Sequence, residues 1–442
     1  MLRLVGKLPL QGRSALSLLA SRGLKTSVAS PCAAPAGASA SASAAEFLDY
    51  PGGRVQFTPS LTVQQPAAQS ESIPCYRVLD GQGVEIPGAE VAHALDKDTS
   101  IKMYHTMLTL QTVDTLFYEA QRQGRFSFYM TSTGEEATVI GAAAALSPED
   151  IVFTQYREQG VLMWRGFTPR QMADQCYGNV NDVGKGRQMP VHYGSRDLKF
   201  HTVSSPLGTQ LPHAVGAAYA ARLQGKNVLT AAFFGEGAAS EGDFHAALNF
   251  AATLRAPVLF LCRNNGWAIS TPASEQYRGD GIAGRGRAYG IPTLRCDGGD
   301  ALAVFNAVKA ARERSLEMQG PVLLEAMSYR SGHHSTSDDS SRYRAADEMK
   351  AWRQRDAVTR FEGFLASKGW FDAEETAALR KSIRKEVIKA LEEAAKTPKP
   401  PVSELFTDVY DKLPAHLLQQ QEEVAAFLKL YPEALPPGVK LQ

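Results

Sequence analysis

The feature that most constrains the fold is an alternation of strand and helix patterns in the middle of the chain. Apolar runs at 151–154, 228–234 and 257–262 have the length and composition of buried strands. Between them, 210–224 and 240–254 have helical patterns, and the first is rich in glycine and alanine, which permit close packing. This order predicts an α/β fold in which a parallel sheet is covered by helices on both faces.

A Gly-Glu-Gly turn at 235–237 directly follows one predicted strand, and an asparagine pair at 264–265 follows the next. Glycines in such a turn allow positive φ and a close approach to an anion, and the following helix N-terminus offers free N–H groups to phosphate. The carboxyl ends of neighbouring parallel strands meet at one crevice, so Glu236 and Asn265 are expected to face the same site. Their oxygens suit Mg²⁺, whose other positions water and diphosphate would fill. The turn alone would be a weak signal, and the spaced asparagines make it specific.

The ends of the chain differ from its middle. Residues 1–45 carry five basic and no acidic residues among Leu, Ser and Ala, which predicts a mitochondrial transit peptide and connector and therefore a protein of the mitochondrial matrix. Residues 46–95 are interrupted by proline and glycine, which predicts an extended N-terminal arm. Residues 96–350 would form the α/β domain, beginning with a helix near 97–122.

The C-terminal residues 351–442 are expected to form a helical region. Asp372 and Glu375 have capping-box spacing ahead of an apolar helical pattern, and that helix should end before Pro398.

Composition excludes several classes of protein. The 47 basic and 46 acidic residues are balanced, so no charge excess directs the chain to nucleic acid or to an anionic membrane. No window of about 18 uninterrupted apolar residues occurs, so no membrane span is expected and the mature protein should be soluble. The five cysteines are scattered without a C-x-x-C pair, which predicts reduced thiols in an intracellular enzyme.

Six longer stretches carry a family resemblance. They are FTQYREQGVLMWRG, GKGRQMPVHYG, SSPLGTQLPHAVGAAYA, FGEGAASEGDFHAALNFAATL, RNNGWAISTP and SGHHSTSDDSSRYR. The Gly-acid-Gly turn with its later Asn-Asn pair is similar to the thiamine-diphosphate signature of transketolase-type enzymes. With these stretches, the chain resembles, over about Pro74 to Pro414, the α subunit of the E1 component of branched-chain 2-oxoacid dehydrogenases. Pyruvate dehydrogenase α subunits are similar in plan but differ around the GKGRQMPVHYG and SSPLGTQ segments.

The resemblance implies a thiamine-diphosphate-binding fold and a set of site residues. His334 would lie over the thiazolium and assist the chemistry. Ser335 would be an inhibitory phosphorylation site under a regulatory kinase and phosphatase. The residues implied for thiamine diphosphate are Tyr156, Arg157, Ser205, Leu207, Gly237, Ala238, Arg263 and His334; those for Mg²⁺ are Glu236, Asn265 and the main-chain carbonyl of Trp267; those for K⁺ are Ser204, Pro206, Thr209 and Gln210.

Four positions depart from the patterns of these families. Glu236 stands where most of the wider superfamily has Asp, and Trp267 replaces a Tyr, but a carboxylate and a main-chain carbonyl remain available to the metal. Gly208 replaces an Ala without removing an oxygen ligand. Ala345 occupies a second phosphorylation position, which excludes that modification.

The function that the resemblance implies is oxidative decarboxylation of branched-chain 2-oxoacids, with reductive acylation of the lipoyl group of the E2 core. The chain would act in an α2β2 heterotetramer with an E1 β subunit that supplies the glutamate for ylid formation. A pyruvate-type α subunit is the alternative within the class. A catalytically dead structural subunit is disfavoured because Arg157, Glu236, Asn265 and His334 are all present.

Overall fold

The computed structural model describes residues 47–50, 53–56 and 72–441 in two units, divided between Gln65 and Pro66. The predicted transit peptide and Cys32 lie outside the described residues. In the first unit, β1 (Phe47–Tyr50) and β2 (Gly53–Gln56) form an antiparallel hairpin. All further elements belong to the second unit.

The second unit is built around a six-stranded sheet in the order β3-β9-β10-β6-β5-β4, and every neighbouring pair is parallel. This confirms the predicted parallel sheet. The sequence patterns placed β4, β5 and β6 but did not mark β9 and β10. The strands are β3 (Cys75–Tyr76), β4 (Ile151–Phe153), β5 (Thr230–Gly235), β6 (Val258–Asn264), β9 (Thr293–Asp297) and β10 (Val322–Met327).

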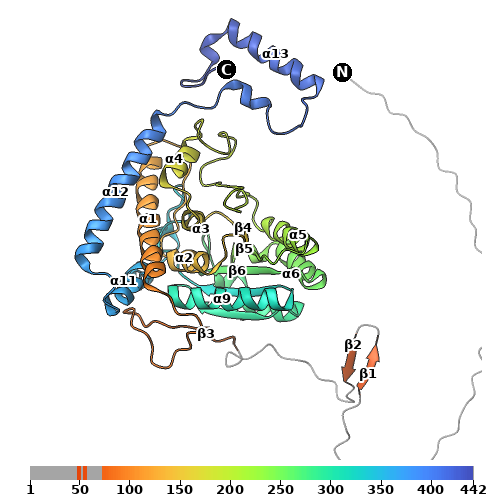
Figure 1. The fold of residues 1–442 in the computed structure, drawn as a ribbon, viewed down its shortest axis with the longest axis vertical. Helices are drawn as coiled ribbons and strands as arrows, with labels where there is room; N and C mark the ends of the chain where they lie inside the picture. Colours follow the sequence, from red (N-terminus) through yellow and green to blue (C-terminus); the bar gives the residue numbers. More distant parts are fainter. Residues whose placement is uncertain (1–46, 51–52, 57–71, 442) are drawn as a thin grey trace, which may run out of the picture. The chain divides into compact units, whose positions relative to one another are not determined.

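Helices cover both faces of the sheet (Figure 1). Successive side chains of a strand point to opposite faces, so Phe233 packs in the larger core with one helix layer while Phe234 packs in the smaller core with the other. The smaller layer is α5 (Gln210–Leu223) and α6 (Gly242–Leu254). The larger layer is α1 (Lys97–Arg122), α2 (Glu136–Ala145), α3 (Gln159–Trp164), α4 (Pro169–Tyr177), α9 (Ala301–Met318), α11 (Ala357–Ser367) and α12 (Ala373–Lys396).

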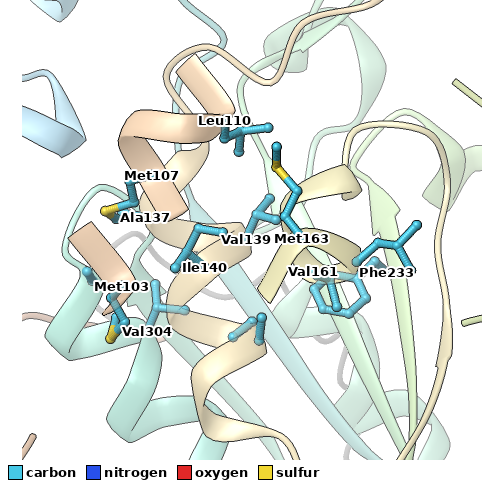
Figure 2. Close-up of a cluster of buried hydrophobic side chains, with 14 of the residues drawn as sticks. Met103, Met107, Leu110, Ala137, Val139, Ile140, Val161, Met163, Phe233 and Val304 are labelled. Carbon is cyan, nitrogen blue, oxygen red and sulfur yellow. The ribbon is translucent and has the colours of Figure 1, made fainter. Parts of the chain in front are cut away.

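Helix α2 is buried on almost every side, as its Ala-rich sequence allows. Figure 2 shows Ala137 and Ile140 of α2 beside Met103 and Met107 of α1 and Val304 of α9. Buried residues of α11 and α12 belong to this same core, so these C-terminal helices pack on the body of the sheet domain.

The helix predicted near 97–122 and the helix predicted between Asp372 and Pro398 are both present. Helix α1 has Asp96 as its N-cap, and α12 begins with the Asp372–Glu375 capping box and ends before Pro398. None of the helices in the described part of the chain has the combined length and apolar character needed to cross a membrane. The four described cysteines, Cys75, Cys176, Cys262 and Cys296, are free thiols.

Short elements complete the second unit. They are η2 (Ala238–Ser240), β7 (Trp267–Ala268), β8 (Thr271–Pro272), α7 (Ala273–Gln276), α8 (Ala283–Gly286), η3 (Arg287–Tyr289), η4 (Ser340–Arg342), α10 (Ala346–Arg353), η5 (Val402–Phe406), α13 (Ala415–Leu430) and η6 (Pro432–Ala434).

Candidate functional site

A cavity of about 380 Å³ lies at the carboxyl ends of β4, β5 and β6. In the parallel register of β5 and β6, Gly235 is opposite Arg263, so the residues that follow the two strands come together. The backbone N–H of Asn265 donates to Oε2 of Glu236 over 3.3 Å. The crevice predicted from the two strand ends is therefore present.

Eleven of the residues implied for the cofactor and the metal line this cavity, although they come from five separate segments. The four residues implied for potassium do not line it. The eleven are Tyr156, Arg157, Ser205, Leu207, Glu236, Gly237, Ala238, Arg263, Asn265, Trp267 and His334.

The Gly-Glu-Gly turn differs from its prediction in one respect. Gly237 has φ −63°, so positive φ is not the reason for glycine there. Space is limiting instead, because a Cβ at Gly237 would lie 2.7 Å from Cβ of Ala268. The helix predicted near Ser240 is present as α6, which begins at Gly242 after a separate 3-10 turn.

The amides of this turn are arranged for an anion. Ala239 and Ser240 donate their N–H groups back to the carbonyls of Glu236 and Gly237. The N–H groups of Gly237 and Ala238 have no backbone acceptor among the described residues, and both residues line the cavity. Free amides beside a cavity are suited to phosphate oxygens.

Glu236 is a buried carboxylate with an unused oxygen. It is 2% exposed, and Oε1 has no hydrogen-bond partner among the described residues. Burial raises the pKa of Glu236 above its ordinary value. No group of three or more His, Cys, Asp or Glu side chains in the described ranges could hold a metal alone. These residues would suit a metal ion that is coordinated by one carboxylate oxygen, one side-chain amide oxygen and main-chain oxygens, and that receives its other oxygen ligands from a bound molecule.

Arg263 is held between two fully buried carboxylates. Its Nη1 lies 2.8 Å from Oε1 of Glu135, and its Nε donates to Glu158. Burial opposes ionisation of Glu135, but the nearby guanidiniums of Arg263 and Arg157 outweigh it and hold the pKa of Glu135 below its ordinary value. The two ion pairs fix the direction of the Arg263 fork at the cavity wall.

His334 lies between two buried guanidiniums. Its Nδ1 is 2.8 Å from Nη1 of Arg330 and 3.2 Å from Nη2 of Arg157. Arg157 also donates to the carbonyls of Thr131 and His334. Burial, followed by the charges of Arg157 and Arg330, lowers the pKa of His334 to about 3. The imidazole is therefore neutral at physiological pH, with Nδ1 as an acceptor.

The segment that carries His334 is tied to its own end. The N–H of His334 donates to Asp338 over 2.7 Å, and the hydroxyl of Tyr343 donates to the same carboxylate oxygen over 2.5 Å. Ser335 is 9% exposed, and its Oγ accepts the N–H of Ser337. The hydroxyl implied for phosphorylation is thus inside the loop in this conformation.

The residues implied for potassium form a separate cluster of oxygens. The hydroxyl of Thr209 lies 3.1 Å from the carbonyl of Pro206 and 3.4 Å from Oγ of Ser204. Gln210 is buried and uses its Nε2 to donate to the carbonyl of Phe233. Gly208, between these residues, has φ +85°, a conformation that glycine adopts without strain.

Several lining residues were missed by the sequence reasoning. His192 and Met189 lie within the quoted GKGRQMPVHYG stretch but show no local signal of their own. Nε2 of His192 is 2.7 Å from Oγ of Ser205, and its Nδ1 is 3.1 Å from the carbonyl of Pro190. Arg330 precedes the quoted SGHHSTSDDSSRYR stretch. The remaining missed residues are Phe128, Met130, Gln155, Ala268 and Ile269; Gly235, which also lines the cavity, belongs to the predicted Gly-Glu-Gly turn.

Comparison with known families settles the class of this site. The model described as dehydrogenase E1 component matches residues 104–403. The chain belongs to the dehydrogenase E1 component family. This stretch holds every residue that lines the cavity, and the family uses thiamine diphosphate. The E1 component assignment makes the chain an enzyme subunit of the 2-oxoacid dehydrogenase class.

Individual members of the E1 family are similar in sequence to this protein over nearly the whole chain. It is 53% identical over 395 residues to 2-oxoisovalerate dehydrogenase subunit alpha 1, mitochondrial, of Arabidopsis thaliana, covering 89% of this chain and 83% of that protein. It is 54% identical over 388 residues to the 2-oxoisovalerate dehydrogenase alpha subunit of Homo sapiens, covering 88% and 87%. The relative in Dictyostelium discoideum is 53% identical over 384 residues, covering 86% of each chain. The resemblance read from the six stretches is confirmed.

Proposed function

We propose that this chain is the α subunit of a branched-chain 2-oxoacid dehydrogenase E1 component and works in the mitochondrial matrix. The relatives are named for 2-oxoisovalerate and for mitochondria. One observation carries the assignment to this chain's own chemistry. Within the described part of the chain, a buried carboxylate oxygen of Glu236 has no hydrogen-bond partner, and the cavity around it also presents free amides and guanidiniums. A metal diphosphate has the complementary charge and oxygen atoms.

The described residues fit thiamine diphosphate with Mg²⁺. Glu236, Asn265 and the carbonyl of Trp267 would hold the ion, and Arg157 with Arg263 would hold the diphosphate beside the Gly237 and Ala238 amides. Bound thiamine diphosphate supplies the electron sink for loss of CO₂ from the oxoacid. Tyr156, Ser205, Leu207 and His334 would form the wall toward the substrate.

The chain's own contribution to the reaction is orientation and a neutral imidazole. His334 lies edge-on to Tyr156, with ring centroids 6.1 Å apart, and its Nδ1 is occupied by arginine donors. Its Nε2 therefore carries the proton in the neutral ring. In this role His334 donates a hydrogen bond from Nε2 to the reacting group without bringing a positive charge into the cavity.

A potassium ion would stabilise the loop that presents Ser205. The oxygens of Ser204, Pro206 and Thr209 already converge, and Gln210 begins the helix behind them. A monovalent cation bound by these oxygens would fix the loop 204–209 without contacting the substrate. Removal of K⁺ should accordingly act on stability and cofactor affinity together.

A β subunit is required to complete the site. Glu236 is the only acid among the described residues that line the cavity, and metal binding would occupy it. A second carboxylate, needed to activate the aminopyrimidine, must then come from another chain. We infer an α2β2 assembly that passes the acyl group to the lipoyl group of an E2 core.

Regulation would act through the loop that carries His334. A phosphate on Ser335 adds roughly −1.5 to −2 charges at pH 7. The hydroxyl is enclosed by the loop, so the modified side chain would not fit in this conformation. We infer that a kinase would release the loop and His334 with it, and that a phosphatase would restore both.

The deciding experiment is co-expression with the β chain, followed by CO₂ release from a panel of 2-oxoacids. Turnover of 2-oxoisovalerate and its branched homologues, dependent on both chains and on thiamine diphosphate, is expected. Preference for pyruvate would favour the pyruvate-type alternative. No turnover of any 2-oxoacid would refute the proposal and favour a structural subunit.

A further inference from the structure

The wall of the cavity formed by Met189 and His192 is a thin segment. Met189 lines both the 380 Å³ cavity and a second of about 730 Å³, while His192 lines the first and a third of about 580 Å³. Val191, inside this segment, is buried in the larger core, whereas Met189 and His192 each face two cavities. The positions of Met189 and His192 therefore depend on the conformation of the turn as well as on packing.

The segment also contains a strained residue. Val191, between Pro190 and His192, is fully buried and has φ +66°. A β-branched residue in the left-handed region is a genuine outlier and persists only where the surroundings determine it. The turn closes through the N–H of His192, which donates to the carbonyl of Met189 over 3.3 Å.

Gln175 on α4 makes the contacts that impose this conformation. Its Oε1 accepts the N–H of Val191 over 3.1 Å, and its Nε2 donates to the carbonyl of Met189 over 2.9 Å. Gln175 is only 4% exposed; its bond with Val191 is buried, and its bond with the carbonyl of Met189 is partly buried. The helix that carries it is itself fixed by a Thr168–Gln171 capping box and a left-handed C-cap at Gly178.

The consequence reaches the substrate side of the site. His192 holds Oγ of Ser205 through its Nε2, and the Sδ atom of Met189 lies 4.0 Å from the same Oγ. We propose that Gln175 is a positioning residue for the oxoacid pocket: by holding both ends of the strained turn, it places Met189 and the His192–Ser205 pair at the cavity. The role in substrate binding rests on the proposed function.

An amide is required at this position because one end of the turn needs an acceptor and the other a donor. Glutamate could accept from Val191 but would oppose the carbonyl of Met189, and leucine would leave the buried Val191 N–H without a partner. Either change should let Val191 relax toward negative φ. Glycine at 191 takes positive φ without strain, so it should weaken the need for Gln175.

The test uses the assembled α and β chains with Gln175→Leu. Its KM for 2-oxoisovalerate should rise about tenfold or more, with kcat and the Kd of thiamine diphosphate changed less than about threefold. Gln420→Leu, which removes an exposed glutamine of α13 whose side chain makes no hydrogen bond among the described residues, is the control and should leave KM unchanged. Adding Val191→Gly to Gln175→Leu should recover part of the lost affinity.

A second readout does not depend on activity. In hydrogen exchange, residues 188–193 should lose protection in Gln175→Leu and in Gln175→Glu but not in Gln420→Leu. If the Gln175→Leu enzyme turns over 2-oxoisovalerate with unchanged KM and unchanged protection, this inference is overturned while the proposed function stands. If KM rises and kcat, cofactor affinity and thermal stability all fall to a similar extent, Gln175 has only a structural role and the inference is overturned. A wild-type enzyme inactive on every 2-oxoacid would instead overturn the proposed function.

Discussion

Nδ1 of His334 lies 2.8 Å from Nη1 of Arg330, so the histidine implied for catalysis accepts a hydrogen bond from a cation. Arg157 approaches the same nitrogen from another segment, 177 residues away in sequence. Protonation of Nδ1 would place three positive groups together in a largely buried space. The loop from Arg330 to Arg344 is therefore closed around a neutral imidazole.

This geometry predicts that acid opens the loop. The pKa of His334 in the closed loop is about 3, below the ordinary value, so an open loop binds the proton more readily. The stabilisation of the closed loop by neutral His334 is complete above the ordinary histidine pKa of about 6.5 and is lost as pH falls toward 3. Protease cleavage within 330–344 should rise between about pH 7.5 and 5.5 in the wild type. His334→Asn should show a weaker pH dependence, and an equal rise in both proteins would contradict the account.

The close contact between Gly237 and Ala268 predicts a matched pair of variants. Gly237→Ala should shift the turn away from β7, because the added methyl group would lie 2.7 Å from Cβ of Ala268. We expect the affinity for thiamine diphosphate with Mg²⁺ to fall at least about tenfold. The double variant Gly237→Ala/Ala268→Gly should recover much of it. Failure of that rescue would mean that the contact is not the cause.

The same turn shows how far sequence reasoning reaches. Strand and helix alternation predicted where the turn lies, because each flanking element is signalled by its own apolar residues. The prediction that glycine at 237 serves a positive φ was wrong, since its φ is −63° and the limiting contact is with Ala268, on a separate short strand after β6. Close approach of this turn to an anion stays a prediction. Local patterns cannot show such a contact.

The end of strand β6 and the whole of strand β10 could not be predicted from the sequence, because buried charged residues in them pair with residues distant in sequence. Strand β6 runs on to Asn264, beyond the predicted apolar stretch, because Arg263 is neutralised by Glu135 and Glu158 and Asn264 donates to Glu325. Strand β10 likewise carries the buried Glu325, paired with Arg295 of β9. These polar residues interrupt the apolar pattern, and their partners are distant in sequence. His192 was missed in the same way, because its contact with Ser205 exists only once the turn at Val191 has formed.

Glu135→Gln should destabilise the protein through Arg263. Glu135 is fully buried, and when it is neutral, Glu158 is the one ion-pair partner left among the described residues for the buried guanidinium of Arg263. We expect a loss of about 2–4 kcal/mol in the free energy of unfolding. Urea titration followed by tryptophan fluorescence measures it. Glu149→Gln, at an exposed position, is the control and should change the value by less than about 0.5 kcal/mol. Equal effects of the two changes would contradict the account.

The position of Ser335 predicts a charge-operated release of its loop. Ser335→Glu places a carboxylate at a residue that is only 9% exposed, so the loop should open and activity of the assembled enzyme should fall. Ser337→Glu adds the same charge two residues away at an exposed position and should leave the loop closed. Limited proteolysis between Arg330 and Arg344 distinguishes them. Full activity and unchanged protection in Ser335→Glu would refute the switch.

The central claim is that Glu236 is the carboxylate that binds the metal of the diphosphate site. Calorimetric titration of thiamine diphosphate into the assembled enzyme, with and without Mg²⁺, tests it most directly. In the wild type, Mg²⁺ should strengthen binding. In Glu236→Ala, which removes the unpartnered Oε1, the Mg²⁺-dependent gain should disappear. An unchanged Mg²⁺-dependent affinity in Glu236→Ala would contradict the account.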